Sequence, residues 1–211
     1  MEITARGVVA PVGEGSRAVA SAPHVAALAD GSMICSYKLG AYKDDPAGVC
    51  EIRVSGDGGD TWTFPRVLLD SPIDDRDAGV LETTKGTLLA TTFTSNAYDE
   101  YYLAKGAHKK WPAARRDAWL AAHTRVPAAA RKSELGTWMI RSTDGGVTWS
   151  PRYDCLVNSP HGPVNLKDGR ILYAGKNLWR KDTWIGVCES KDDGKSWQKL
   201  APVSYTHLRA H

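Results

Sequence analysis

The chain has 211 residues, of which 42% are hydrophobic, and its net charge is +3 at pH 7. This length suits one large domain or two small ones, and so mild a charge gives no reason to expect binding to nucleic acid or to a membrane. No apolar run reaches the roughly 18 residues that a membrane-spanning helix needs.

Three stretches of the chain repeat one order of elements. PHVAALADGSMICSY precedes EIRVSGDGGDTW, AGVLETTKGTLLATTF precedes WMIRSTDGGVTW, and GPVNLKDGRILYAG precedes IGVCESKDDGKSW. Each stretch has a turn sequence between two apolar runs, at residues 30–31, 85–86 and 168–169. Asp-Gly at such a place is a strong hairpin signal, and Lys-Gly is a weaker one. We therefore predict an all-β fold in which each unit is a four-stranded antiparallel meander.

The spacing of the units predicts an insertion in the second one. Trp149 and Trp197 lie 48 residues apart, a suitable length for one four-stranded unit, whereas Trp62 and Trp149 lie 87 apart. We assign the surplus to about residues 98–134, which are rich in Ala, Lys and Arg. Pro112 suits the first turn of a helix that runs to about residue 123, and Pro127 allows a second short helix.

Each unit contains the pattern Ser-x-Asp-x-Gly-x-x-Trp. We expect the aspartate to accept hydrogen bonds from backbone N–H groups of its turn, the glycine to take a positive φ, and the tryptophan to pack between strands. A phosphate cradle would instead need amides at a helix N-terminus. The structural residues are Ser55, Asp57, Gly59 and Trp62; Ser142, Asp144, Gly146 and Trp149; and Ser190, Asp192, Gly194 and Trp197.

These three patterns resemble the Asp-box (BNR) repeats of the sialidase (neuraminidase) superfamily, whose members are six-bladed β-propellers. The resemblance covers about residues 20–203 and implies a partial β-propeller of about three blades, with the helical insertion in the second. The blades would span about residues 20–72, 76–158 and 161–203 of an incomplete domain at 1–203. Three blades cannot close such a ring, so we expect the N-terminal half of a longer protein. The final SYTHLRAH (204–211) breaks the repeat and is expected to be a non-native tail.

Cysteine usage gives no sign of a metal site. Cys35, Cys50, Cys155 and Cys188 lie in separate segments without the C-x-x-C spacing of zinc sites, which favours buried free thiols, with one disulfide as the alternative. We expect neither a metal nor another cofactor. The opening MEITARGVVAPVGEGS lacks the pattern of a signal peptide. The chain is thus either cytoplasmic or lacks its true N-terminus, while the resemblance to bacterial secreted proteins implies a secreted or periplasmic parent.

The resemblance implies an exo-α-sialidase that removes terminal sialic acid or a related sugar from glycans. Sialidases bind the substrate carboxylate with three arginines, and they use an aspartate as acid/base and a Glu-activated Tyr as nucleophile. Asp44 or Asp45 fits the place of the acid/base, although both could simply form a polar turn. Ser21 stands two residues before Pro23, where the family has its first arginine.

That departure leaves other functions open. The remaining arginines and the Tyr–Glu pair belong to later blades, so we expect this chain alone to be inactive. A non-catalytic propeller that binds glycans or proteins is the alternative, and a hydrolase for a different sugar is a third possibility.

Further candidates lie where blade loops should meet the mouth of the channel. Arg76 is the best contact for an anionic ligand, or else a structural ion-pair partner of its neighbouring aspartates, which include Asp77. His24 and His161 occupy corresponding places in two blades and are either structural or ligand contacts. Trp179 and Arg180 form either a sugar-stacking platform or packing within their own blade.

The basic insertion admits two interpretations. Its cluster of Lys, Arg and His residues could suggest nucleic acid, but a helical flap over the channel mouth is favoured. Trp111, Trp119 and Leu120 would anchor this flap. We therefore expect a glycan as the partner, and neither nucleic acid nor membrane.

Overall fold

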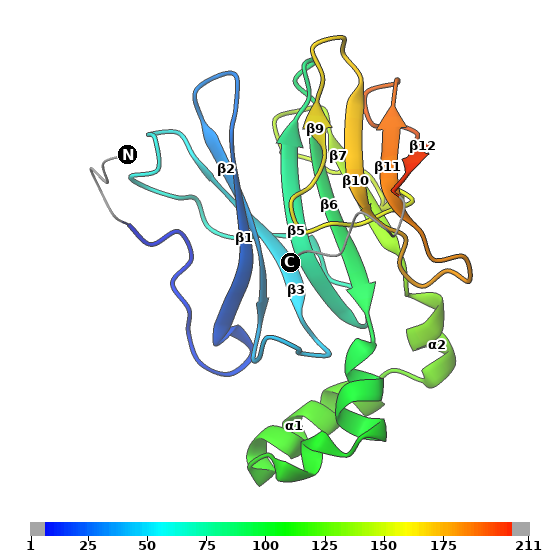
Figure 1. Cartoon of the computed structure of the whole chain (residues 1–211). Helices are drawn as coiled ribbons and strands as arrows, with labels where there is room; N and C mark the ends of the chain where they lie inside the picture. The colour runs from blue at the N-terminus through cyan, green and yellow to red at the C-terminus, as the bar shows by residue number, and fades with distance from the viewer. Residues whose placement is uncertain (1–6, 204–211) are drawn as a thin grey trace, which may run out of the picture.

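The three repeated units fold into three separate four-stranded antiparallel sheets (Figure 1). The structure is a computed structural model that describes residues 7–203, so the expected tail at 204–211 lies outside the described residues. The first sheet contains β1 (Val19–Ala27), β2 (Met33–Gly40), β3 (Val49–Ser55) and β4 (Arg66–Leu69), in that order. Its β1–β2 turn closes with a hydrogen bond from Leu28 N to Ser32 O, and Gly31 in this turn has a φ of 88°.

The other two sheets repeat this plan. The second contains β5 (Asp74–Glu82), β6 (Leu88–Ser95), β7 (Thr137–Ser142) and β8 (Tyr153–Asp154), and the third contains β9 (Val164–Asn165), β10 (Ile171–Lys176), β11 (Ile185–Ser190) and β12 (Gln198–Pro202). Within each sheet, strands that follow one another in sequence are neighbours. The predicted all-β class, with meanders arranged as a partial propeller, is confirmed.

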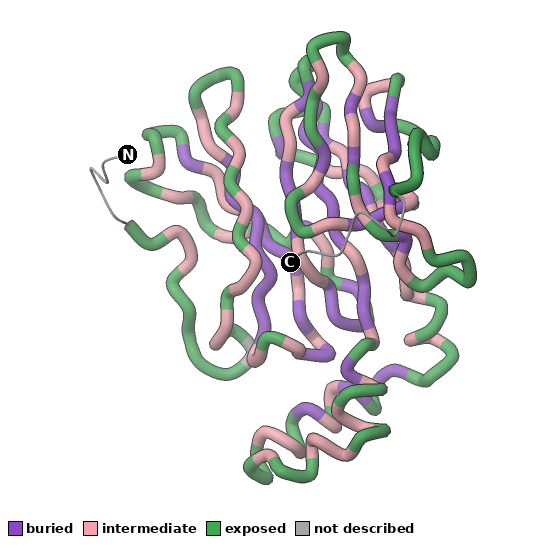
Figure 2. The backbone as a smooth tube through the Cα atoms, viewed as in Figure 1, coloured by how far each residue is buried: buried purple, intermediate pink, exposed green. Residues whose placement is uncertain are grey.

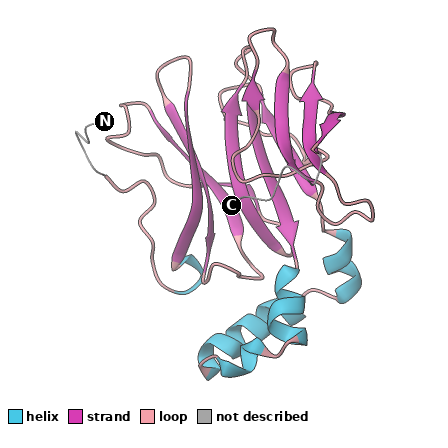
Figure 3. Cartoon of the chain, viewed as in Figure 1, coloured by secondary structure: helices cyan, strands magenta, loops and turns pink. Residues whose placement is uncertain are grey.

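The insertion of the second sheet is helical. It connects β6 to β7 through a π-helical turn (Asp99–Ala104), a 3-10 turn (Ala107–Lys110), α1 (Ala113–Thr124) and α2 (Ala128–Ser133). Pro112 and Pro127 are the N-caps of α1 and α2, as their sequence positions predict. The helices gather at one end of the sheets (Figure 3). No helix within residues 7–203 is long and apolar enough to cross a membrane.

Two apolar clusters hold neighbouring sheets together, and buried residues concentrate along the strands (Figure 2). The first cluster joins the first and second sheets, with Ile34 and Ile52 facing Leu88 and Ile140. The second joins the second and third sheets and consists of Leu89, Met139, Cys155, Val157, Ile171, Tyr173 and Cys188. All four cysteines are buried free thiols.

The Ser-x-Asp-x-Gly-x-x-Trp turns share their serine and aspartate hydrogen bonds in all three sheets. The bond from the indole to the glycine carbonyl occurs in the first two, whereas in the third the carbonyl of Gly194 accepts from the hydroxyl of Tyr153. In the second sheet, Asp144 Oδ1 accepts a hydrogen bond from Thr148 N at 2.9 Å, and Ser142 Oγ accepts one from Gly146 N at 2.8 Å. The indole of Trp149 donates back to the carbonyl of Gly146 at 3.2 Å. The carboxylate of the turn aspartate thus accepts hydrogen bonds from the backbone of its own hairpin and has a structural role.

The tryptophans of the Ser-x-Asp-x-Gly-x-x-Trp turns pack on clusters at the same face of each sheet. Trp149 packs against the cluster between the first two sheets, and Trp197 against the cluster between the second and third. Trp62 packs on the other face of the first sheet, against a small cluster of Cys35, Tyr37 and Leu39 that residues 9–10 partly cover. The Trp therefore marks the face that each sheet turns toward its predecessor.

Candidate functional site

The loop between β2 and β3 carries two consecutive aspartates with different surroundings. The carboxylate of Asp45 accepts hydrogen bonds from the backbone N–H of Ala41 at 2.6 Å and of Ala47 at 3.0 Å, and the residue is 6% exposed. The side chain of Asp44 is 30% exposed and lines a cavity. Asp45 therefore holds the shape of the loop, and Asp44 is the carboxylate that faces open space.

Asp44 lies between a cation and a phenol. Arg76 Nη2 of β5 is 3.2 Å from Asp44 Oδ1, and the hydroxyl of Tyr102 donates a 2.5 Å hydrogen bond to Asp44 Oδ2. Burial and the hydrogen bond to Asp44 raise the pKa of Tyr102 to about 12, so this hydroxyl remains a proton donor at neutral pH. The carboxylate is thereby oriented from two directions, by the second sheet and by the insertion.

The insertion is fixed to the Asp44 loop by aromatic packing. Trp119 is only 2% exposed, and its indole donates to the backbone carbonyl of Asp44 at 3.0 Å. The guanidinium of Arg115 lies 4.4 Å from the ring centroid of Tyr42 in the loop and 4.3 Å from that of Trp111 in the insertion. Trp119 thus makes the anchoring contact expected of it. Trp111 packs within the insertion, against Tyr102 and Trp119, and Leu120 is half-buried.

Buried charges lie beneath Arg76. Lys38 Nζ is 2.5 Å from Asp74 Oδ1, with both side chains almost fully buried, and it also donates to the carbonyl of Lys43 at 2.6 Å. Arg76 Nε is 3.7 Å from Asp74 Oδ2. Burial raises the pKa of Asp74 to about 7, against the opposing effect of Lys38 and Arg76. The guanidinium of Arg76 therefore lies between the buried carboxylate of Asp74 and the partly exposed carboxylate of Asp44.

The start of the inner strand is bent in the same way in the first two sheets. Both β1 and β5 have a register shift, and each shift contains a residue with positive φ, Ala22 at 49° and Asp77 at 46°. Ser21 and Arg76 directly precede these residues. Arg76 thus occupies in the second sheet the position that Ser21 occupies in the first, where the resemblance to sialidases implies an arginine.

His24, His161 and Asp77 form a neighbouring group. The two imidazole rings meet edge-to-face with centroids 5.7 Å apart. The pKa of His24 is lowered by burial and by His161, and the charge of Asp77 opposes this effect. Counted back from the hydrogen bonds that close the β1–β2 and β9–β10 turns, the two histidines lie one place out of correspondence. The two positions are therefore not strictly equivalent in the repeat, in contrast to the sequence-based expectation.

Trp179 and Arg180 lie in the loop between β10 and β11, beside a different cavity. The indole of Trp179 donates to the carbonyl of Thr94 at 2.9 Å, and Arg180 forms an ion pair with Asp154 of β8. The residues around this cavity include none that line the cavity at Asp44. The loop thus packs on the neighbouring blade, and not on its own blade as the structural alternative supposed.

The Asp44 cavity measures about 200 Å³ and is lined by Asp44, Arg76, Ala97, Tyr98, Tyr101 and Tyr102. It offers one carboxylate for proton transfer, one guanidinium for an anionic or polar group, and phenol rings for an apolar face. Among residues 7–203, no group of three or more His, Cys, Asp or Glu side chains is arranged to hold a metal ion.

Sequence reasoning did not identify Tyr102 or Lys38 as parts of this region. Tyr102 lies in the segment AYDEYY at the start of the insertion, where three tyrosines within five residues are an unusual density for a solvated flap. Lys38 carries no such signal, because a lysine in a strand is ordinarily exposed. Gly48 explains part of its burial, since a Cβ there would lie 2.5 Å from Lys38 Cε and 2.4 Å from Asp74 Oδ1.

No family model matches the chain, and no curated protein matches it either. Solved structures do match. A Hadza microbial sialidase is 19% identical with a TM-score of 0.63 over 90% of this chain, and a variant of the NanB sialidase from Streptococcus pneumoniae is 11% identical with a TM-score of 0.61 over 93%. A protein of unknown function from Dyadobacter fermentans is 22% identical with a TM-score of 0.58 over 93%.

The fold is sialidase-like. At these identities the similarity concerns the fold and not the activity. The chain spans 38% of the Hadza sialidase, 46% of the NanB sialidase and 57% of the Dyadobacter protein.

Proposed function

We propose that this chain supplies three blades of a sialidase-like glycoside hydrolase that acts on glycans ending in sialic acid or a related sugar. The observation that carries the proposal is the Asp44–Arg76 pair, which faces a cavity at the insertion end of a sialidase-like fold. The blades are proposed at about residues 20–72, 76–158 and 161–203, as part of a longer propeller. The insertion, proposed at about 98–134, serves as a wall of the site.

Within this proposal Asp44 is the acid/base. A group that transfers a proton to the leaving oxygen must be within reach of substrate, and Asp44 is partly exposed at the cavity. Asp45 was an equal candidate in the sequence, but it is only 6% exposed, does not line the cavity and accepts hydrogen bonds from the loop backbone. We therefore assign the chemistry to Asp44 and the support of the loop to Asp45.

Arg76 is proposed to bind the substrate carboxylate. A planar guanidinium pairs with a carboxylate through two parallel hydrogen bonds. Arg76 takes in the second sheet the register position of Ser21 in the first, so it offers an arginine at the equivalent place one sheet further on. Asp77, His24 and His161 would then border the substrate on the channel side.

Hydrolysis of a fluorogenic sialoside by the longer protein that contains this chain tests the proposal. We expect turnover by the wild type, strong loss in Asp44→Asn, and a raised KM in Arg76→Ala, whereas Asp45→Ala should lower stability first. Absence of turnover with any sialoside, in a correctly folded protein, would reject the sialidase assignment.

A non-catalytic glycan-binding propeller is the second candidate. Ser21 favours it, because the first strand lacks the arginine that the sialidase resemblance requires. In that case glycan binding would survive Asp44→Ala, and no glycoside would be hydrolysed. A hydrolase for a neutral sugar would instead turn over neutral glycosides and still depend on Asp44.

A further inference from the structure

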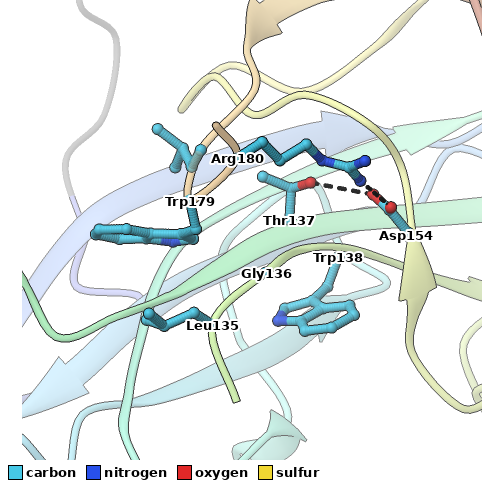
Figure 4. Close-up of a pocket in the computed structure, with 8 residues that line it drawn as sticks. Leu135, Gly136, Thr137, Trp138, Asp154, Trp179 and Arg180 are labelled. Atoms are coloured by element: carbon cyan, nitrogen blue, oxygen red, sulfur yellow. Dashed lines mark hydrogen bonds and ion pairs between the residues drawn. The ribbon is translucent and has the colours of Figure 1, made fainter. Parts of the chain in front are cut away.

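Thr94, near the end of β6, holds two tryptophan side chains. Its carbonyl oxygen accepts a 2.9 Å hydrogen bond from Trp179 Nε1, and its hydroxyl oxygen accepts a 3.0 Å hydrogen bond from Trp138 Nε1. Both indoles border a cavity of about 240 Å³ between the second and third sheets (Figure 4). One threonine therefore fixes two large aromatic rings beside the same opening.

The polar groups of this cavity form a neutral pair. Arg180 and Asp154 are ion-paired, each side chain being 45% exposed, and Thr137 Oγ1 lies 3.3 Å from Asp154 Oδ1. Figure 4 shows this pair on one side of the opening and the indole of Trp179 on the other. The cavity thus combines an aromatic face with hydrogen-bonding groups and has no net charge of its own.

Trp179 has a strained backbone conformation, and its ring lies at the edge of the cavity. Its φ of 62° lies in the left-handed region, which bulky side chains rarely adopt and which occurs mainly where the surroundings enforce it. The hydrogen bond of the indole to the carbonyl of Thr94 holds the ring in this position, and 43% of the residue remains exposed. Strain of this kind is concentrated at ligand-binding sites.

We propose that this cavity binds one ring of a neutral sugar, separately from the Asp44 site. The apolar C–H face of the ring would lie on Trp179, and its hydroxyls would exchange hydrogen bonds with Asp154, Arg180 and Thr137. The cavity is smaller than the roughly 300 Å³ at which sites for drug-sized ligands begin, which suits a single ring. The inference goes beyond the proposed function, since the two cavities share no lining residue.

Titration of the protein with lactose, followed by the indole N–H signals in a proton–nitrogen NMR spectrum, tests this inference. The chain has eight tryptophans, and the signal absent from Trp179→Phe identifies Trp179. We expect lactose to shift this signal in the wild type and equally in Asp44→Asn. Trp179→Ala should weaken the affinity about tenfold or more, because the stacking face is lost.

The inference is overturned if the Trp179 signal does not move, or if Asp44→Asn abolishes lactose binding while Trp179→Ala retains it. Should Trp179→Ala fail to fold, Arg180→Gln decides, because Arg180 is half-exposed at the rim of the cavity. Weakened lactose binding in Arg180→Gln supports the site, and unchanged binding rejects it. None of these outcomes depends on hydrolysis, so failure of the proposed enzyme activity remains distinguishable.

Discussion

The hydroxyl of Tyr102 donates a 2.5 Å hydrogen bond to Asp44 Oδ2, and Oδ1 of the same carboxylate pairs with Arg76. A residue of the helical insertion thus orients a residue of the first sheet against a residue of the second. The candidate site therefore exists only when three parts of the chain, distant in sequence, pack together.

Tyr102→Phe should lower kcat/KM of the longer protein about tenfold. A hydrogen bond to a charged group contributes about 1.5 kcal/mol or more, and tenfold corresponds to about 1.4 kcal/mol. The measurement is steady-state hydrolysis of a sialoside. Tyr101→Phe is the matched control, because Tyr101 is adjacent and 66% exposed. Equal rates for the two variants would show that the phenol of Tyr102 does not position Asp44.

Asp45→Ala should destabilise the protein by about 1–3 kcal/mol, because it removes the acceptor of two backbone N–H groups in a buried loop. Urea denaturation measures this change. Asp44→Asn is expected to change stability less, since its side chain is partly exposed. A larger loss of stability in Asp44→Asn than in Asp45→Ala would contradict the division of roles between these aspartates.

Asp75 should make the protein less stable as the pH rises. Burial raises its pKa from 3.8 to about 7, against the opposing effect of the hydrogen bond that the backbone N–H of Ser71 donates to its carboxylate. The protonated form suits the folded state, so the stabilisation is complete below about pH 4 and is lost as the pH rises through about 7.

Asp75→Asn should therefore flatten the dependence of the unfolding free energy on pH between these limits. The slope should change by up to about 1.4 kcal/mol per pH unit. Asp74 remains in the variant and has a raised pKa as well, so part of the slope should persist. Identical slopes in wild type and variant would show that Asp75 titrates normally.

Trp149→Ala should cost more stability than Trp62→Ala. Both indoles donate to the glycine carbonyl of their own turn, so their hydrogen bonds are matched. Trp149, however, packs against the cluster that joins two sheets, and its removal should cost about 3 kcal/mol. Trp62 contacts only the face of the first sheet that residues 9–10 partly cover. Equal losses, measured by urea denaturation, would indicate that this face is as tightly packed as the interface between sheets.

The sequence was sufficient to predict the sheets and the insertion. Turn pairs such as Asp30–Gly31 and the spacing of Trp62, Trp149 and Trp197 are readable from the sequence alone, and such local signals determine hairpins. Pro112 and Pro127 likewise marked the helix starts correctly, because proline is tolerated at the first turn and not further inside.

The contacts of the candidate site were harder to predict. That Asp45 and not Asp44 supports the loop depends on which carboxylate turns toward Ala41 and Ala47, and adjacent residues in a loop carry no periodicity that reveals this. The contact of Tyr102 with Asp44 bridges 58 residues and depends on how the insertion docks. Long-range contacts of this kind require the packed chain.

The central claim is that Asp44 donates a proton to the leaving group of a glycoside. The most direct test compares Asp44→Asn with wild type, in the longer protein, on two sialosides: one with a sugar as leaving group and one with 4-nitrophenol. General acid catalysis contributes about 10²–10⁴-fold, so hydrolysis of the sugar-linked sialoside should fall at least about 100-fold. The nitrophenyl sialoside should lose much less, because its leaving group needs little protonation. If Asp44→Asn hydrolyses the sugar-linked sialoside as fast as the wild type, the claim is contradicted.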